Sequence, residues 1–159
     1  RGDALQPPLR GRFGLVVAGN LLRHLWPRVA GAGPRAWSSL VAPGGALWIL
    51  EDEPALDEPA GANYAALQDL LGRLVPGRQP LLPLASFRSA RRGWGWPGTW
   101  RDGRQPNRWT LDAGRVAAWL DAGAPAPGGE VARLRAALDH DGIACVRSWW
   151  ARWRPEADA

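Results

Sequence analysis

Small and polar residues stand where an apolar run of the sequence gives way to a helix-like run. Leu15–Ala18 is apolar, Gly19 and Asn20 follow directly, and helical spacing begins at Leu21. Glycine removes the clash of a Cβ atom, and asparagine offers both hydrogen-bond donors and an acceptor. Such a pair at the carboxyl end of a strand is typical of a place where a ligand binds.

Two titratable side chains lie close to the ends of the apolar runs. His24 follows Asn20 within about one helical turn, where it could take a proton from a substrate. Glu51 follows the second apolar run together with Asp52 and Glu53, where it could orient a basic substrate by charge. The alternatives are a histidine on a helix surface and a polar loop at the acidic residues.

The other titratable residues do not predict a catalytic or metal site. His140 stands between Asp139 and Asp141, but three adjacent residues cannot all converge on one ion, so we expect a solvated helix end and no metal. No serine, histidine and aspartate set has the spacing of a nucleophilic site. The single cysteine, Cys145, excludes an internal disulfide and indicates a reducing, cytoplasmic compartment.

A segment rich in tryptophan, arginine, glycine and proline occupies residues 80–109. Its part from residue 88 onward interleaves Arg88, Arg91, Arg92, Arg101, Arg104 and Arg108 with Trp94, Trp96, Trp100 and Trp109. Aromatic planes and guanidinium groups together suit nucleobases or an anionic aromatic substrate. The alternative is a long loop whose tryptophans pack over a sheet while its arginines stay in water.

The elements that must position these residues follow from hydrophobic spacing and turn signals. They predict strands over 13–18, 46–50 and 143–153, and helices over 20–30, 34–41, 62–75, 110–120 and 129–140. We expect strand 13–18 to be covered on both faces, Pro27 to break the first helix, Asn63 to be an N-cap, and Gly142 to end the last helix. This order predicts an α/β domain with parallel strands.

Composition bounds the class of protein. The chain has 159 residues, enough for one domain, and no apolar run long enough to span a membrane. Its net charge is +5, and all 20 basic residues are arginine, which indicates the codon bias of a GC-rich, bacterial genome more than a nucleic-acid partner. Position 1 is not methionine, so we expect a fragment or a processed chain.

The segments "GDA" (2–4), "RFGLVVAGNLLRHL" (12–25) and "LVAPGGALWILED" (40–52) resemble class I S-adenosylmethionine-dependent methyltransferases. The resemblance implies the second half of a Rossmann-like, doubly wound sheet, with residues 1–159 as one partial domain. Its parts would be a core over 1–79, an insertion and helix over 80–128, and a terminal helix and strands over 129–159. Strand 13–18 would then be an exposed edge of this half sheet.

The resemblance also implies roles for the candidate residues. Asp3 and Ala4 match the position that contacts the cofactor's adenine, and Ala18, Gly19, Asn20 and Leu21 match the position beside its sulfonium. His24 and Glu51 become acceptor-side candidates in a methyl transfer to a small molecule. Two departures stand against it: Gly14 replaces the usual aspartate, and the glycine-rich loop of the first strand is absent from this sequence.

Two other classes of function stay open at this point. One is a non-catalytic nucleic-acid-binding module that uses segment 88–109, whose binding should weaken steeply with salt. The other is a degenerate methyltransferase remnant that serves as a structural subunit and pairs its apolar edge strand with another chain.

Overall fold

The computed structural model describes residues 3–74, 79–112, 114, 118, 128–141 and 143–156. Residue contacts divide the chain into two compact units, which are described separately. Unit 1 comprises residues 1–51, 82–105 and 149–159, and unit 2 comprises residues 52–81 and 106–148. No helix in the described ranges is long and apolar enough to cross a membrane.

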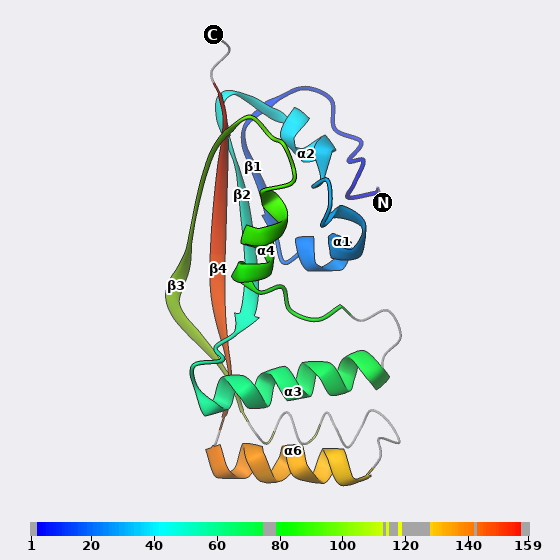
Figure 1. The fold of residues 1–159 in the computed structure, drawn as a ribbon, viewed down its shortest axis with the longest axis vertical. Helices are drawn as coiled ribbons and strands as arrows, with labels where there is room; N and C mark the ends of the chain where they lie inside the picture. The colour runs from blue at the N-terminus through cyan, green and yellow to red at the C-terminus, as the bar shows by residue number, and fades with distance from the viewer. Residues whose placement is uncertain are drawn as a thin grey trace. The chain divides into compact units, whose positions relative to one another are not determined.

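Four strands form one sheet in the order β1-β2-β4-β3 (Figure 1). They are β1 (Phe13–Gly19), β2 (Val41–Pro54), β3 (Gly98–Asp112) and β4 (Ile143–Pro155). β1 and β2 are parallel, with Leu15 opposite Ala46 and Gly19 opposite Leu50. The prediction of an α/β chain with a parallel strand pair is therefore confirmed, within a mixed sheet of four strands.

The Pro43-Gly44-Gly45 turn lies inside β2 as an irregularity of its pairing with β1. Phe13 is opposite Val41, whereas Leu15 is opposite Ala46, so β2 carries extra residues at this point. Gly44 has φ +73°, and a Cβ atom on Gly45 would lie 2.8 Å from the Gly14 carbonyl oxygen. Glycine is therefore needed at both positions, and this Pro-Gly-Gly segment forms a bulge in β2.

Three helices cover one face of the sheet in unit 1 (Figure 1). They are α1 (Leu22–Val29), α2 (Arg35–Ser39) and α4 (Leu84–Arg91). Alternate residues of the strands point into this core because side chains alternate along a strand. The core comprises Ala18, Leu22, Leu25, Val29, Trp37, Val41, Leu47, Ile49, Leu82, Leu84, Phe87, Trp94, Trp149, Ala151 and Trp153.

β1 is an edge strand with one exposed face. Leu15 and Val17 are 59% and 55% exposed, whereas Ala18 is buried. The expectation of a strand covered on both faces is wrong for the described residues, because the helices of unit 1 pack on the other face of β1. The position at the edge agrees with the exposed edge that the resemblance implied.

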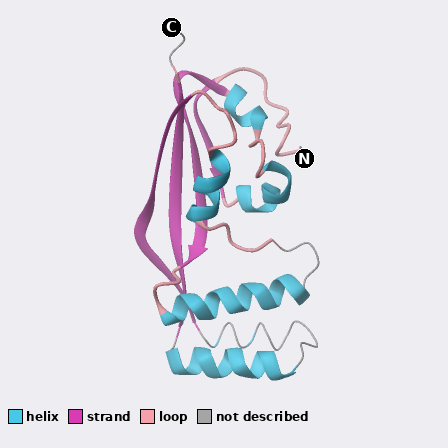
Figure 2. Ribbon diagram, in the orientation of Figure 1, coloured by secondary structure: helices cyan, strands magenta, loops and turns pink. Residues whose placement is uncertain are grey.

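Segment 80–109 contains helix α4 and part of strand β3, and loop residues that include Trp94 and Trp96 connect the two (Figure 2). Trp94 is buried, and its Nε1 donates a hydrogen bond to the Ala30 carbonyl oxygen at 3.1 Å. Ring contacts of 5.0–6.4 Å link the aromatic residues of this cluster, which are Phe87, Trp94, Trp96, Trp100, Trp149 and Trp153. The rings of these tryptophans contact one another or Phe87 within unit 1, which favours a role in core packing over a role in stacking on nucleobases.

The arginines at the start of this segment are also engaged within unit 1. Arg88 donates to Asp102 through Nε at 2.7 Å, and Arg91 contacts the other carboxylate oxygen at 2.7 Å. The Arg91 guanidinium also lies over the rings of Phe87 and Trp100, at 5.6 and 5.4 Å from their centroids. Nucleic-acid binding by segment 88–109 stays a prediction that this arrangement does not favour.

Unit 2 contains the remaining two helices, α3 (Pro59–Leu74) and α6 (Gly128–Asp141). α3 begins four residues before Asn63, since proline is favoured in the first turn of a helix and Pro59 starts it. Asn63 is therefore not the N-cap, and its Nδ2 instead donates to the Ala137 carbonyl oxygen at 3.2 Å. In unit 1, α1 continues through Pro27, so the predicted break there is wrong. The buried side chains of Leu22, Leu25 and Val29 anchor this short helix in the core.

The helix predicted over 110–120 is wrong at its start, because β3 continues through Asp112. Most of that range, and also Gly142, lies outside the described residues. The final strand and the helix before it are confirmed as β4 and α6.

Candidate functional site

The junction between β1 and α1 is conformationally unusual. Asn20 has φ +49° and is the one non-glycine residue at positive φ in the described ranges. Its backbone N–H donates to the Leu50 carbonyl oxygen at 2.8 Å, which extends the pairing with β2 by one residue. Asparagine tolerates this left-handed conformation better than most residues, and such outliers gather at functional sites.

Gly19 leaves space at the carboxyl end of β1. A Cβ atom built there would meet nothing within 4 Å, and both Gly19 and Asn20 are exposed. The buried Ala18 precedes them, and Leu21 follows as the N-cap residue of α1 without a capping side chain. Four predicted binding residues thus form one open strand-to-helix turn.

Glu51 supplies the cap that the start of α1 lacks. The first turn of α1 contains no acidic residue, and the backbone N–H of Arg23 donates to Glu51 Oε1 at 3.2 Å. Glu51 is only 1% exposed, on β2 beside the end of β1. A carboxylate here satisfies an N–H group that has no partner within the helix and interacts favourably with the helix dipole.

His24 lies on the exposed surface of α1, next to the capped residue. Its Nε2 is 3.3 Å from Nε of Arg23, from which it can accept a hydrogen bond. Arg23 thus contacts Glu51 through its backbone and His24 through its side chain, and His24 is exposed whereas Glu51 is buried.

Asp3 and Ala4 lie in a tight turn. Asp3 forms an isolated bridge with Gln6, and its Oδ1 accepts a hydrogen bond from the Leu5 N–H at 2.9 Å. The Ala4 carbonyl oxygen accepts from Trp37 Nε1 at 2.7 Å. The Asp3 carboxylate is about half exposed and lies 4.0 Å from the Arg28 guanidinium.

The predicted residues thus form two groups at the two ends of α1. Glu51 and the turn over 18–21 meet the first residues of the helix, whereas Asp3 faces Arg28 in its last turn. An eight-residue helix is about 12 Å long. A ligand that contacts both groups must therefore be extended along α1.

The acidic run does not form the polar loop that was the alternative. β2 continues through Pro54, and Asp52 accepts a hydrogen bond from Ser148 Oγ at 2.8 Å in unit 2. Glu53 is buried in unit 2 as well. The same unit holds a bidentate pair in which Arg147 donates to Asp57 at 2.8 and 2.9 Å, and this bond raises the pKa of Arg147.

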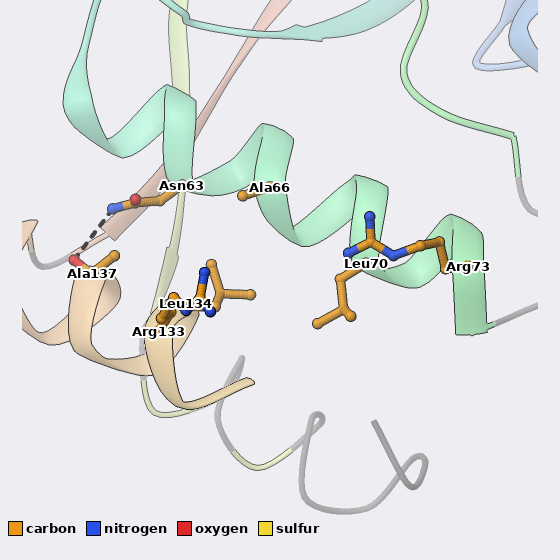
Figure 3. A pocket seen from close by; sticks show the side chains of 7 residues that line it. All are labelled: Asn63, Ala66, Leu70, Arg73, Arg133, Leu134 and Ala137. Atoms are coloured by element: carbon orange, nitrogen blue, oxygen red, sulfur yellow. Dashed lines mark hydrogen bonds between the residues drawn. The ribbon is translucent and has the colours of Figure 1, made fainter. Parts of the chain in front are cut away.

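A hollow between α3 and α6 was not predicted from the sequence (Figure 3). Its described lining includes Leu70 and Arg73 of α3 and Arg133 and Leu134 of α6. Within each helix, the spacing of these apolar and cationic residues places them close together on its surface. The sequence does not show that α3 and α6 pack against each other. Within the described ranges, no group of histidine, cysteine and acidic side chains has the arrangement of a metal site.

No protein-family model matches the chain, and no curated protein matches it in sequence. Among solved structures, it is similar to a "putative methyltransferase" from Bacillus halodurans C-125, with a TM-score of 0.53 and 12% identity. That match covers 98% of this chain and 70% of the other. The chain has a methyltransferase-like fold.

A second structure is described as a "putative sarcosine dimethylglycine methyltransferase" from Galdieria sulphuraria. It matches with a TM-score of 0.42 and 14% identity, over 98% of this chain and 58% of the other. This chain therefore spans only part of both proteins. At these identities the likeness concerns the fold, and the residues of the site must carry any argument about activity.

Proposed function

We propose that the chain contributes one side of an S-adenosylmethionine site and takes part in methyl transfer to a small molecule. The observation that carries this proposal is the open turn after β1, where Asn20 is held in a left-handed conformation beside a glycine with free space around it. Parallel α/β sheets place ligands at the carboxyl ends of their strands, which is where this turn lies.

The residues present suit two parts of the cofactor. The exposed Asp3 carboxylate can accept a hydrogen bond from the adenine amino group, and the Gly19-Asn20 turn leaves room for the sulfonium end. When bound, S-adenosylmethionine supplies an electrophilic methyl group. The two groups lie at opposite ends of α1, which suits an extended ligand of this kind.

In this proposal the chain mainly positions its ligands. Holding two reacting groups in line provides most of the rate increase in such a transfer, so a strong base is not required. Glu51 fixes the start of α1 and thereby the Asn20 turn. His24 is exposed near the same turn, and we infer that it takes the proton that the methylated substrate releases.

Calorimetry of S-adenosylhomocysteine binding to the protein that contains this chain tests the proposal. Asn20→Gly retains the left-handed backbone but removes the amide, and Asp3→Asn removes the carboxylate charge. We expect Asn20→Gly to weaken binding about three- to tenfold, the range of one hydrogen bond to a ligand, and Asp3→Asn to weaken it less, because the amide keeps an acceptor oxygen. Asp57→Asn, in unit 2, is the control and should leave binding unchanged.

Two results would contradict the proposal. One is no binding of S-adenosylhomocysteine to the unmodified protein, and the other is binding that neither Asn20→Gly nor Asp3→Asn weakens. A folded variant with unchanged thermal unfolding is required for each measurement, so that loss of binding is not loss of structure.

A further inference from the structure

The hollow between α3 and α6 in unit 2 has the size and lining of a small-molecule site. Its volume is about 310 Å³, close to the lower limit of about 300 Å³ for ligand pockets. In the described part of the chain it is lined by Asn63, Ala66, Leu70, Arg73, Arg133, Leu134 and Ala137. Its described lining belongs to unit 2, whereas the residues of the candidate site all belong to unit 1.

Side-chain size explains why a hollow exists between these helices. Leu70 and Leu134 are buried and point toward the space between α3 and α6 (Figure 3). Ala66 and Ala137 lie about one turn from them along the same helices and carry only a methyl group. The leucines hold the helices together while the alanines leave the neighbouring space unfilled.

The lining combines an apolar floor with positive charge. Arg73 of α3 and Arg133 of α6 are both exposed at the hollow, and its described lining contains no acidic residue. A guanidinium has five N–H donors and matches a carboxylate geometrically. Either arginine can therefore keep a partner within the protein and still donate to a ligand.

We propose that this hollow binds a small carboxylate with an apolar body. Arg73 and Arg133 lie at different places along the hollow (Figure 3), so the carboxylate pairs with either guanidinium, and the apolar body covers Leu70 and Leu134. The apolar majority of the lining favours such a ligand over inorganic phosphate, which would leave the leucines uncovered. The small volume excludes a ligand of nucleotide-cofactor size.

Nuclear magnetic resonance titration of the protein that contains this chain tests the proposal. Three probes are added separately: hexanoate, its uncharged analogue hexan-1-ol, and inorganic phosphate. We expect hexanoate to shift the amide signals of Ala66, Leu70, Leu134 and Ala137 at lower concentration than either other probe. Arg73→Gln and Arg133→Gln should each weaken hexanoate about two- to fivefold, as for an exposed ion pair, and leave hexan-1-ol unchanged.

Two further variants complete the design. Arg101→Gln removes an exposed guanidinium from β3 in unit 1 and should leave hexanoate binding unchanged. Ala66→Leu fills the hollow from an exposed helix position, so it should abolish the shifts caused by both hexanoate and hexan-1-ol without unfolding α3.

Three outcomes would overturn the proposal. They are the absence of shifts on α3 and α6, hexanoate binding that the Arg73→Gln and Arg133→Gln double variant does not weaken, and phosphate binding as tightly as hexanoate at the same amides. The proposal does not depend on the methyl-transfer proposal, because none of these measurements involves S-adenosylhomocysteine.

Discussion

Removing the carboxylate of Glu51 should loosen the start of α1 specifically. Glu51 is almost wholly buried and accepts the Arg23 N–H, and α1 has neither a capping side chain at Leu21 nor an acidic residue in its first turn. The helix therefore depends on β2 for its cap. Glu51→Ala removes the acceptor, whereas Glu51→Gln keeps an acceptor and removes only the charge.

The expected magnitudes follow from the hydrogen bond and the burial. A hydrogen bond to a charged group contributes about 1.5–3 kcal/mol, and leaving the donor unsatisfied has a similar cost. Glu51→Ala also leaves a small cavity, so we expect α1 to lose about 3 kcal/mol. Glu51→Gln should cost about 1 kcal/mol, because the lost attraction to the helix dipole is partly offset by relief of carboxylate desolvation.

Hydrogen exchange of the α1 amides measures this loss directly. Each 1.4 kcal/mol corresponds to a tenfold change, so the protection of Arg23 should fall by about a hundredfold in Glu51→Ala and about fivefold in Glu51→Gln. Asp52→Asn, on the next residue of β2, is the matched control because Asp52 accepts from Ser148. Equal protection of Arg23 in Glu51→Ala and the unmodified protein would refute the capping role.

Five further substitutions test the packing of the two units and the exposed edge of β1. In α3, Gly72→Ala should raise the free energy of unfolding, measured in urea, by about 0.5–1 kcal/mol. Gly61→Ala should lower it, because its Cβ atom would clash with the Ala55 carbonyl. Equal effects of the two variants would contradict this prediction. Asp102→Asn should lower the free energy of unfolding by about 3 kcal/mol, since the Asp102 side chain is 6% exposed between two arginines. Asp57→Asn should lower it by less than about 1 kcal/mol, since the Asp57 side chain is 65% exposed. A larger loss in Asp57→Asn than in Asp102→Asn would contradict this reasoning. Leu15→Lys, on the exposed edge strand β1, should lower the self-association of the protein in analytical sedimentation, while Tm stays within about 2 °C. Unchanged self-association would show that it does not involve the β1 edge.

The alternation of apolar runs and helical spacing was sufficient to predict the parallel β1–β2 pair, because local patterns determine these elements. The same pattern gave the wrong burial for β1. A continuous apolar run is typical of a strand covered on both faces, but whether a second layer is present is a property of the whole sheet. The exposed Leu15 and Val17 follow from the edge position and not from the residues of β1 themselves.

The contacts of Glu51 and Asp3 could not be predicted from the sequence. Glu51 was expected near the end of β1, and the sequence could not show that its partner would be a backbone N–H 28 residues earlier. Asp3 was expected beside a ligand, and the structure adds Arg28 as its neighbour from the far end of α1. Contacts between residues so far apart in sequence depend on tertiary packing, which local propensity does not encode.

The tryptophan and arginine segment shows why composition is a weak guide to partners. Arginine and tryptophan together satisfy the chemistry of nucleic-acid recognition, but they satisfy one another equally well inside a protein. In unit 1, Arg91 lies over Phe87 and Trp100, and Asp102 binds the same arginine. A surface of this composition binds nucleic acid only where its rings and guanidinium groups face solvent. In unit 1, Arg91 and the rings of Phe87 and Trp100 contact one another instead. By contrast, Arg73 and Arg133 line the described hollow of unit 2, on helices where neither composition nor motif marked a site.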